Sequence, residues 1–174
     1  ARTFQNIRLF SNLSVLDNVK ISFDYRVKYS LFDSIFRTPK FKKEEQEIRN
    51  ESIELLKAFS LDSKMDELSK NLSYGEQRKL EIVRALAANP SLLLLDEPAA
   101  GMNPQETVEL MNLINWVKDT FNISVLLIEH DMKLVMGICE KIVVLDYGKK
   151  IAEGTPEEIK NNPKVIEAYL GEGA

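Results

Sequence analysis

The run Ser91-Leu92-Leu93-Leu94-Leu95, which ends in Asp96-Glu97-Pro98, places the strongest limit on what this chain can fold into. A strand that is apolar at successive positions is typical of a parallel sheet covered on both faces. A second apolar run, residues 123–128, ends at Glu129-His130-Asp131. We predict that both runs are buried strands, and parallel strands need helical connections between them. An α/β fold is therefore expected for this half of the chain.

Helix-start signals recur through the same half. Each has an N-cap residue, in most cases followed by a proline and then an acidic residue. They stand at residues 103–106, at Asp131 and at residues 155–158. Residues 141–146 and 149–152 have the composition of two strands joined by a turn at Tyr147-Gly148.

The first half, residues 1–90, shows helical periodicity and almost no strand signal. Ser14 is a candidate cap for a helix whose inner face would carry four apolar residues. These are Val15, Leu16, Val19 and Phe23. A second helix is predicted over residues 44–59, and the basic stretch before it, residues 29–43, is predicted to be a solvated loop. We therefore divide the chain into a helical part, residues 1–90, and a sheet-containing part, residues 91–174.

Charge and composition exclude some classes of protein. The net charge is −4 and the sequence pI is about 5.2, which argues against a nucleic-acid binder, because such proteins present a basic face. Cys139 is the only cysteine, so no intramolecular disulfide can form, and a reduced, cytosolic setting fits. No apolar run approaches the roughly 20 residues that a membrane span requires.

Acidic residues and a histidine follow the two apolar runs. Asp96 and Glu97 end the first run, and His130 follows the second. Ligands of α/β proteins bind beyond the carboxyl edge of the strands, where a carboxylate pair could hold Mg²⁺ and orient a water. A histidine on the adjacent strand could contact a terminal phosphate. The alternatives are that the carboxylates only cap helices and that His130 is a satisfied core residue.

The segment Leu72-Ser73-Tyr74-Gly75-Glu76-Gln77-Arg78 has the spacing of a helix start. Ser73 and Glu76 stand three residues apart, as in a capping box. The free N–H groups and positive dipole end of such a helix attract phosphate, and Gly75 would let a ligand approach closely. The alternative is an ordinary capped helix without a ligand.

This segment is also where the chain resembles a known family. Residues 72–77 resemble the LSGGQ signature of ABC ATPases, with Tyr74 in place of the first glycine. The other motifs of that family occur in the right order and spacing over essentially the whole chain. They are the Q-loop at residues 4–6, the post-signature helix at 78–86, the Walker B strand at 92–98, the D-loop at 99–103 and the switch histidine at His130.

The resemblance narrows to the ATPases of branched-chain amino-acid transporters, the LivG type. It rests on residues 1–10, 37–39, 97–104, 151–156 and 168–171. It implies an ABC ATPase that uses ATP and Mg²⁺ to energise uptake of branched-chain amino acids. It also implies a truncated P-loop NTPase of the α/β class, with a helical subdomain followed by a partial, mostly parallel sheet.

The resemblance assigns roles to four residues near the strand ends. Gln5 would contact the Mg²⁺ and the attacking water and would sense the membrane subunit. Asp96 would hold the Mg²⁺ through water, and Glu97 would be the general base or water-positioning group. His130 would contact the γ-phosphate, and so would serve both catalysis and ATP binding.

Other residues would act across subunits. Ser73, Gly75 and Gln77 would act on the ATP held by a second ATPase subunit, because the family shares each site across a head-to-tail dimer. Gly101 and Asn103 would belong to the D-loop, where many members have aspartate in place of Asn103. The helices before the signature would dock transmembrane permease subunits, which implies a peripheral protein at the cytoplasmic face of a bacterial membrane. A periplasmic or extracellular solute-binding protein would be an indirect partner.

Residues 1–174 contain no phosphate-binding loop of the form G-x-x-x-x-G-K-[ST]. The first glycine is Gly75, and the only Gly-Lys pair, Gly148-Lys149, follows a strand in the wrong place. We expect that this chain alone neither binds ATP tightly nor hydrolyses it, and that open apolar sheet edges cause self-association. Besides a truncated ATPase, it could be a naturally short interaction module that docks a membrane subunit or pairs with a complete ATPase. A non-transport ABC ATPase is a third alternative, against which the LivG-type segments argue.

Overall fold

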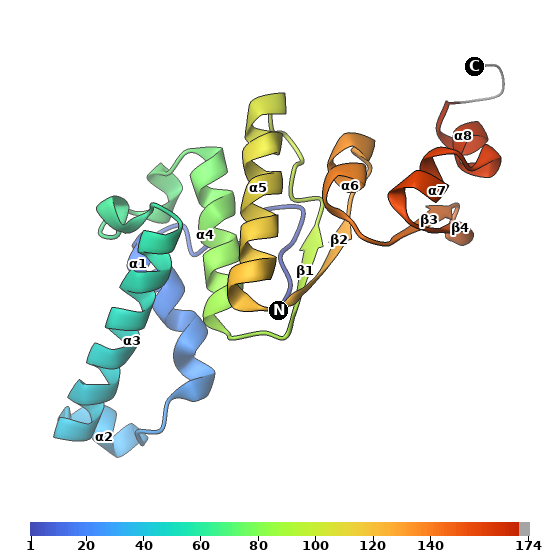
Figure 1. Ribbon diagram of the computed structural model, residues 1–174. Coiled ribbons are helices and arrows are strands. Elements are labelled where there is room, and N and C mark those ends of the chain that lie inside the picture. The colour runs from blue at the N-terminus through green and yellow to red at the C-terminus, as the bar shows by residue number, and fades with distance from the viewer. Residues whose placement is uncertain (171–174) are drawn as a thin grey trace.

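The computed structural model describes residues 1–170, so the end of the LivG-like segment at Gly171 lies outside the described residues. Helices of the first half form an arm beside a small central sheet, and a hairpin with two short helices lies on the other side (Figure 1). The first-half elements are α1 (Val15–Lys20), a 3₁₀ helix (Ile21–Arg26), α2 (Leu31–Phe36), α3 (Pro39–Ala58), two 3₁₀ turns (Asp62–Lys64 and Ser69–Asn71) and α4 (Tyr74–Ala87). The second-half elements are β1 (Leu92–Asp96), α5 (Pro104–Phe121), β2 (Ser124–Ile128), α6 (Met132–Ile138), β3 (Ile142–Asp146), β4 (Lys149–Gly154), α7 (Pro156–Lys160) and α8 (Pro163–Leu170).

The predicted helix starts are confirmed by their caps. Ser14 Oγ accepts the N–H of Asp17 at the start of α1, and the four apolar residues assigned to the inner face of that helix are buried. The side chains of Asn103, Asp131 and Thr155 accept N–H groups in the first turns of α5, α6 and α7. Each cap satisfies backbone donors that have no partner within the helix, which is why these starts could be read from the sequence.

The prediction for the basic stretch was wrong. Residues 29–43 do not form a loop: α3 begins at Pro39, five residues before the predicted start at Glu44, with Thr38 as its N-cap. A separate short helix, α2, precedes it and is capped by a box between Ser30 and Asp33. A helix of six residues is too short to show a full hydrophobic period, so periodicity alone could not detect it.

The central sheet places the ends of β1 and β2 side by side. The two strands pair in parallel, as predicted, with Asp96 opposite Ile128. On the other side of β1, Thr3 donates its N–H to the carbonyl of Leu94 at 2.9 Å, and Leu94 donates to the carbonyl of Ala1 at 2.9 Å. The beginning of the chain therefore runs beside β1, a pairing that the helical periodicity of the first half did not predict.

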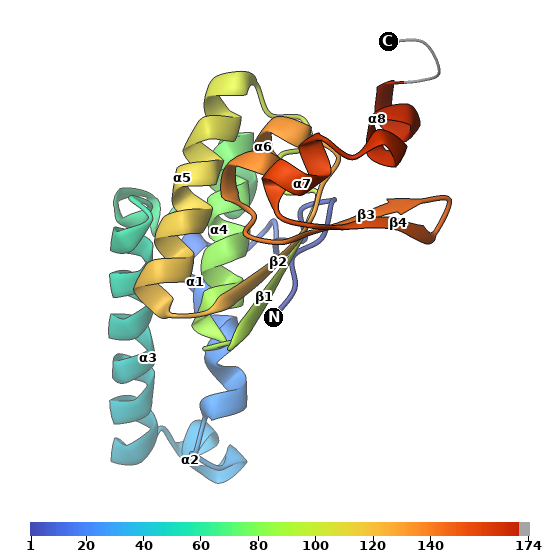
Figure 2. The same ribbon diagram turned by 45° about the vertical axis from the view of Figure 1, so that its right-hand side comes forward.

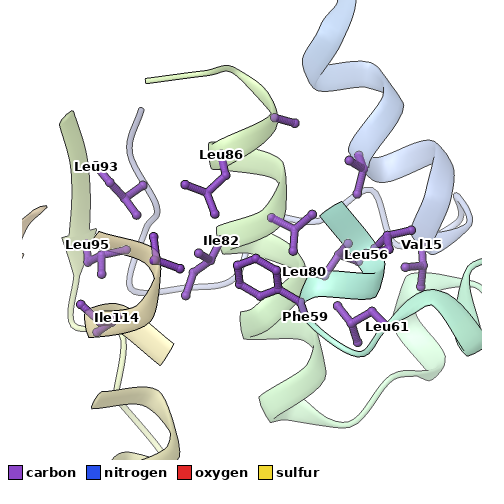
Figure 3. Packing of buried hydrophobic residues seen from close by; sticks show 14 of the residues in the cluster. Val15, Leu56, Phe59, Leu61, Leu80, Ile82, Leu86, Leu93, Leu95 and Ile114 are labelled. Carbon is purple, nitrogen blue, oxygen red and sulfur yellow. The ribbon is translucent and has the colours of Figure 1, made fainter. Parts of the chain in front are cut away.

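The main core joins the arm to the sheet through α4. Leu80 packs on the side of Leu56 and Phe59, while Ile82 and Leu86 face Leu93 and Leu95 of β1 (Figure 3). Helix α5 contributes Leu110, Ile114 and Val117 to the same buried cluster. One face of the sheet is thus covered by α4 and α5.

The opposite face of the sheet is open among residues 1–170, so the prediction that both strands are buried on both faces was wrong. Exposure alternates along β2, and the side chains of Leu126 and Ile128 are more than half exposed. Leu92 at the start of β1 is also exposed. Apolar residues at successive positions show that a strand can be covered on both faces, but they do not show which segment covers it.

The β3–β4 hairpin forms as predicted, with Tyr147 and Gly148 both at positive φ in its two-residue turn. A second, smaller core lies under the hairpin and includes residues of α6, α7 and α8. The outer residues of β3, Val143 and Leu145, are more than half exposed and face a cleft of about 590 Å³ that also borders β2.

We expect the chain of residues 1–174 to self-associate through these open apolar positions. Leu126, Ile128, Val143 and Leu145 together form an exposed apolar edge, and contact between two copies would remove it from water. Sedimentation velocity over a range of concentrations should show a dimer or larger species. Replacing Leu126 and Ile128 together by serine should raise the dissociation constant about tenfold or more. A protein that stays monomeric at all concentrations would contradict this.

Candidate active site

Three of the predicted site residues meet where β1 and β2 end. Gln5 Nε2 donates to Glu97 Oε2 at 2.7 Å, and His130 Nδ1 lies 4.0 Å from the same oxygen. Glu97 donates its backbone N–H to the carbonyl of Ile128 at 2.9 Å and has a φ of 42°, in the left-handed region. A non-glycine residue in that region carries backbone strain of about 1–2 kcal/mol, and such strain gathers at functional sites. The same carboxylate oxygen of Glu97 thus meets both Gln5 and His130 at the ends of the strands.

Asp96, the predicted Mg²⁺ residue, is ion-paired. Its Oδ2 accepts from Arg2 Nη2 at 2.7 Å, and the Arg2 side chain is half exposed. No group of three or more acidic, histidine or cysteine side chains that could hold a metal occurs among the described residues. Mg²⁺ needs few protein ligands when phosphate oxygens and water complete its shell, and the carboxylate and amide oxygens here are the hard donors it prefers. The residues fit a Mg²⁺ that arrives with phosphate, provided that the Arg2 side chain leaves the Asp96 carboxylate.

Glu129, which the sequence reasoning did not select, joins this cluster. Its carboxylate is buried and accepts the N–H groups of Ala99 at 2.9 Å and His130 at 3.2 Å. It ties the segment after β1 to the end of β2. The His130 side chain itself is 73% exposed, so the alternative that it is a buried core residue does not hold.

The predicted phosphate-binding helix start is formed by the first turn of α4. Ser73 and Glu76 make both bonds of a capping box. The bond from Lys64 Nζ, at 2.7 Å, lowers the pKa of Glu76, bonds from Ser73 lower it further, and partial burial acts in the opposite direction. Ser73 and Gly75 line a small cavity of about 150 Å³. A Cβ at Gly75 would meet no atom within 4 Å, so the space above it is open.

Tyr74, at the position of the first signature glycine, bridges the signature to the predicted D-loop. Its hydroxyl donates to the carbonyl of Ala100 at 2.7 Å, and its ring lies 3.9 Å from where a Cβ on Gly101 would be. Gly101 has a φ of 79°, which glycine adopts without strain. The side chain of Gln77, by contrast, bonds within the signature segment: its amide donates to the carbonyl of Leu72 at 2.9 Å.

Asn103 uses its side chain to cap α5. Its Oδ1 accepts the N–H groups of Gln105 and Glu106 at 2.9 and 3.0 Å. Asparagine and aspartate are about equally good N-caps, so the departure from aspartate at this position leaves the capping role unchanged.

A buried ion pair that the sequence reasoning missed holds the predicted Q-loop against α4. Arg78 is 1% exposed, and its guanidinium donates to the carbonyls of Phe4 and Gln5 at 2.8 and 2.9 Å and to Glu81 Oε2 at 2.6 Å. The other oxygen of Glu81 accepts the N–H groups of Phe4 and Arg8, both at 3.4 Å. The signal in the sequence was the spacing of Arg78 and Glu81, which carry opposite charges and stand three residues apart at buried positions of α4.

The structure thus gathers the predicted residues into two groups. Gln5, Asp96, Glu97 and His130 lie at the ends of β1 and β2, and Ser73, Gly75, Gly101 and Asn103 lie around the starts of α4 and α5. The first group can orient a water beside a phosphate. The second offers an open helix N-terminus.

Comparison with known proteins identifies the family of the chain. The family model described as "ABC transporter" matches residues 1–100. The ATP-binding protein LivG of Salmonella typhimurium is 46% identical over 171 residues, which is 98% of this chain and 67% of that protein. The chain belongs to the ABC transporter ATP-binding family.

Further matches place the chain among several ABC ATPases. A model described as "Branched-chain amino acid ATP-binding cassette transporter" matches residues 149–174. BraF of Pseudomonas aeruginosa, a branched-chain amino acid transport ATP-binding protein, is 44% identical over 98% of this chain and 67% of that protein. The crystal structure of the ADP conformation of MJ1267, an ATP-binding cassette, superposes with a TM-score of 0.77 at 30% identity, covering 99% of this chain and 68% of that one.

These matches confirm the predicted family and fold class, an ABC ATPase of the α/β class. The chain spans about two thirds of the length of these relatives. ABC ATPases bind ATP, form dimers and work with transmembrane permease subunits. Within residues 1–170, no helix has the length and apolar character needed to cross a membrane.

Proposed function

We propose that this protein is the ATP-hydrolysing subunit of a transporter that energises uptake of branched-chain amino acids. The observation that carries the proposal is the convergence of Gln5, Glu97 and His130 at the ends of β1 and β2. The solute assignment is supported by the similarity to LivG and BraF and by the family model at residues 149–174.

In this proposal each residue of the strand-end group has one task. Glu97 accepts a hydrogen bond from the attacking water and orients it, and Gln5 holds the Glu97 carboxylate in place. Asp96, freed from Arg2, would hold Mg²⁺, and His130 donates to the γ-phosphate. Mg²⁺, when bound with ATP, neutralises the charge that develops on the phosphates.

The second group acts on the ATP of a partner subunit. Ser73 and Gly75 present a hydroxyl and free backbone N–H groups at an open helix start, and Gly101 and Asn103 lie beside it. Gln77 joins them only if its amide leaves the Leu72 carbonyl.

The partners and the place in the cell follow from the same proposal. Residues 1–90 carry the arm that docks the permease subunits at the cytoplasmic face of a bacterial membrane, and residues 91–174 carry the remaining ATPase core. A solute-binding protein outside that membrane delivers the amino acid.

Residues 1–174 alone are expected to bind ATP weakly and not to hydrolyse it. The phosphate contacts they offer are the strand-end groups, without the amide cradle and lysine of a P-loop. Titration of the isolated chain with a fluorescent ATP analogue and a phosphate-release assay check this. Nucleotide-stimulated phosphate release well above background would contradict it.

Leucine uptake tests the function in the cell. Deleting the gene for this protein should abolish high-affinity uptake of labelled leucine, isoleucine and valine and leave uptake of an unrelated amino acid such as lysine unchanged. Returning the gene should restore it. Normal uptake of all three after deletion would refute the proposed solute class. The second candidate, an interaction module without hydrolysis, predicts the same loss on deletion but no need for the Glu97 carboxylate.

A further inference from the structure

Helix α2 displays a dense apolar surface at the far end of the arm, remote from the sheet (Figures 1 and 2). Four of its six residues are large and apolar, with exposed fractions of 64–84%. They are Leu31, Phe32, Ile35 and Phe36. Their spacing places them on one helix face, and the rings of Phe32 and Phe36 lie 4.4 Å apart between centroids. We call this surface the apolar tip. Contiguous exposed apolar surface of this kind marks a site of interaction.

The polar side of α2 is anchored, so the apolar tip is held facing outward. Asp33 accepts the N–H and hydroxyl of Ser30 through one carboxylate oxygen and the hydroxyl of Thr38 through the other, at 2.8–2.9 Å. Behind it, the rings of Tyr29 and Phe41 meet edge to face at 4.9 Å. These contacts fix α2 to the start of α3 by its polar side and leave the apolar side without a cover among the described residues.

Positive charge surrounds the apolar tip. Residues 26–43 hold six basic residues and one acidic residue, Asp33, although the whole chain has a net charge of −4. The basic residues are Arg26, Lys28, Arg37, Lys40, Lys42 and Lys43. Some of them contact acidic side chains of α3, as Arg26 does with Glu51 at 3.0 Å. The segment nevertheless keeps a strong positive excess.

We propose that the apolar tip inserts into an anionic lipid surface while the surrounding lysines and arginines contact the headgroups. Amphipathic helices that lie in a membrane interface combine an apolar face, often with aromatic residues, with basic residues on their flanks. Anionic lipid adds about 1 kcal/mol of attraction for each basic residue near the surface. The composition favours lipid over a protein partner, because four of the six basic residues are lysines and lysine is depleted from protein–protein interfaces. This surface is separate from the ATPase residues, and its proposal does not rest on hydrolysis.

Vesicle flotation with the whole chain tests the proposal. The protein should float with vesicles of phosphatidylglycerol mixed with phosphatidylcholine, bind phosphatidylcholine alone more weakly, and lose binding as salt rises. The double variant Phe32→Ser/Phe36→Ser should lower the partition coefficient about tenfold or more. The triple variant Lys40→Gln/Lys42→Gln/Lys43→Gln should lower it about 100-fold at low salt, with a flatter salt dependence.

The matched control is Val108→Ser/Tyr147→Ser, which removes two exposed apolar side chains that lie outside both α2 and the apolar edge of the sheet. Its binding should equal that of the unaltered protein. All variants should keep the same far-UV circular dichroism, because the substituted side chains are exposed. Absence of binding to anionic vesicles at low salt would overturn the proposal, as would equal binding by the Phe32/Phe36 variant. Binding only to vesicles that contain the permease subunits would overturn it in favour of a protein partner.

Discussion

Replacing Glu97 by glutamine is expected to lower ATP-driven leucine uptake about 10²- to 10³-fold in cells whose only copy carries the change. Glutamine has the size of glutamate but is a poor proton acceptor, so it cannot polarise the attacking water. Its side chain can still meet Gln5, because the amide oxygen accepts a hydrogen bond at the position of Glu97 Oε2. The initial rate of uptake of labelled leucine, normalised to the amount of protein in the membrane fraction, measures the effect.

The matched control is Glu157→Gln, the same change at an exposed position in the first turn of α7. It should leave uptake unchanged. Normal uptake with Glu97→Gln, together with loss of uptake on gene deletion, would mean that the protein serves transport without hydrolysing ATP. The interaction-module interpretation would then replace the enzymatic one.

Replacing Arg78 by alanine is expected to destabilise the protein by about 3–5 kcal/mol, which is a large part of the stability of a domain. The change leaves the Glu81 carboxylate buried without its charge partner and removes the donors to the carbonyls of Phe4 and Gln5. Urea unfolding followed by circular dichroism measures the free energy of unfolding.

Lys79→Ala, on the next residue of the same helix, provides the control and should change that free energy by about 0.5 kcal/mol or less. The double variant Arg78→Met/Glu81→Leu should recover part of the loss, because it leaves no buried charge, although the backbone of residues 4–8 still lacks its partners. If Arg78→Ala lowers the free energy of unfolding no more than Lys79→Ala does, the Arg78–Glu81 pair does not hold the Q-loop segment.

Local signals predicted much of the fold. The caps at Ser14, Ser73 and Asn103, and the hairpin turn at Tyr147-Gly148, follow from backbone groups that need a partner close in sequence. The meeting of the strand-end residues followed from the rule that parallel strands end at one edge of a sheet. The roles of these residues in ATP hydrolysis stay predictions until the variants are measured.

Long-range partners could not be predicted in the same way. The apolar pattern of β2 indicated burial on both faces, but the cover of a strand comes from other segments, and Leu126 and Ile128 face outward. The backbone carbonyls that accept hydrogen bonds from Arg78 lie 73 and 74 residues earlier in the chain, where no local spacing points to them. The short helix α2 was hidden because six residues do not show a full hydrophobic period. The true start of α3 at Thr38 and Pro39 was missed because the charges of that stretch made it look like a loop.

Because Arg78 of α4 binds the carbonyls of residues 4 and 5, the position of these residues is coupled to the position of α4. Its first turn carries Ser73 and Gly75, and its second turn holds the backbone of the Q-loop through a buried, charge-assisted clamp. A displacement of Gln5 by one part of an assembly must either break that clamp or carry the whole helix with it. Because breaking it would leave a buried charge unpaired, we expect a displacement of Gln5 to shift the open N-terminus of α4 as well.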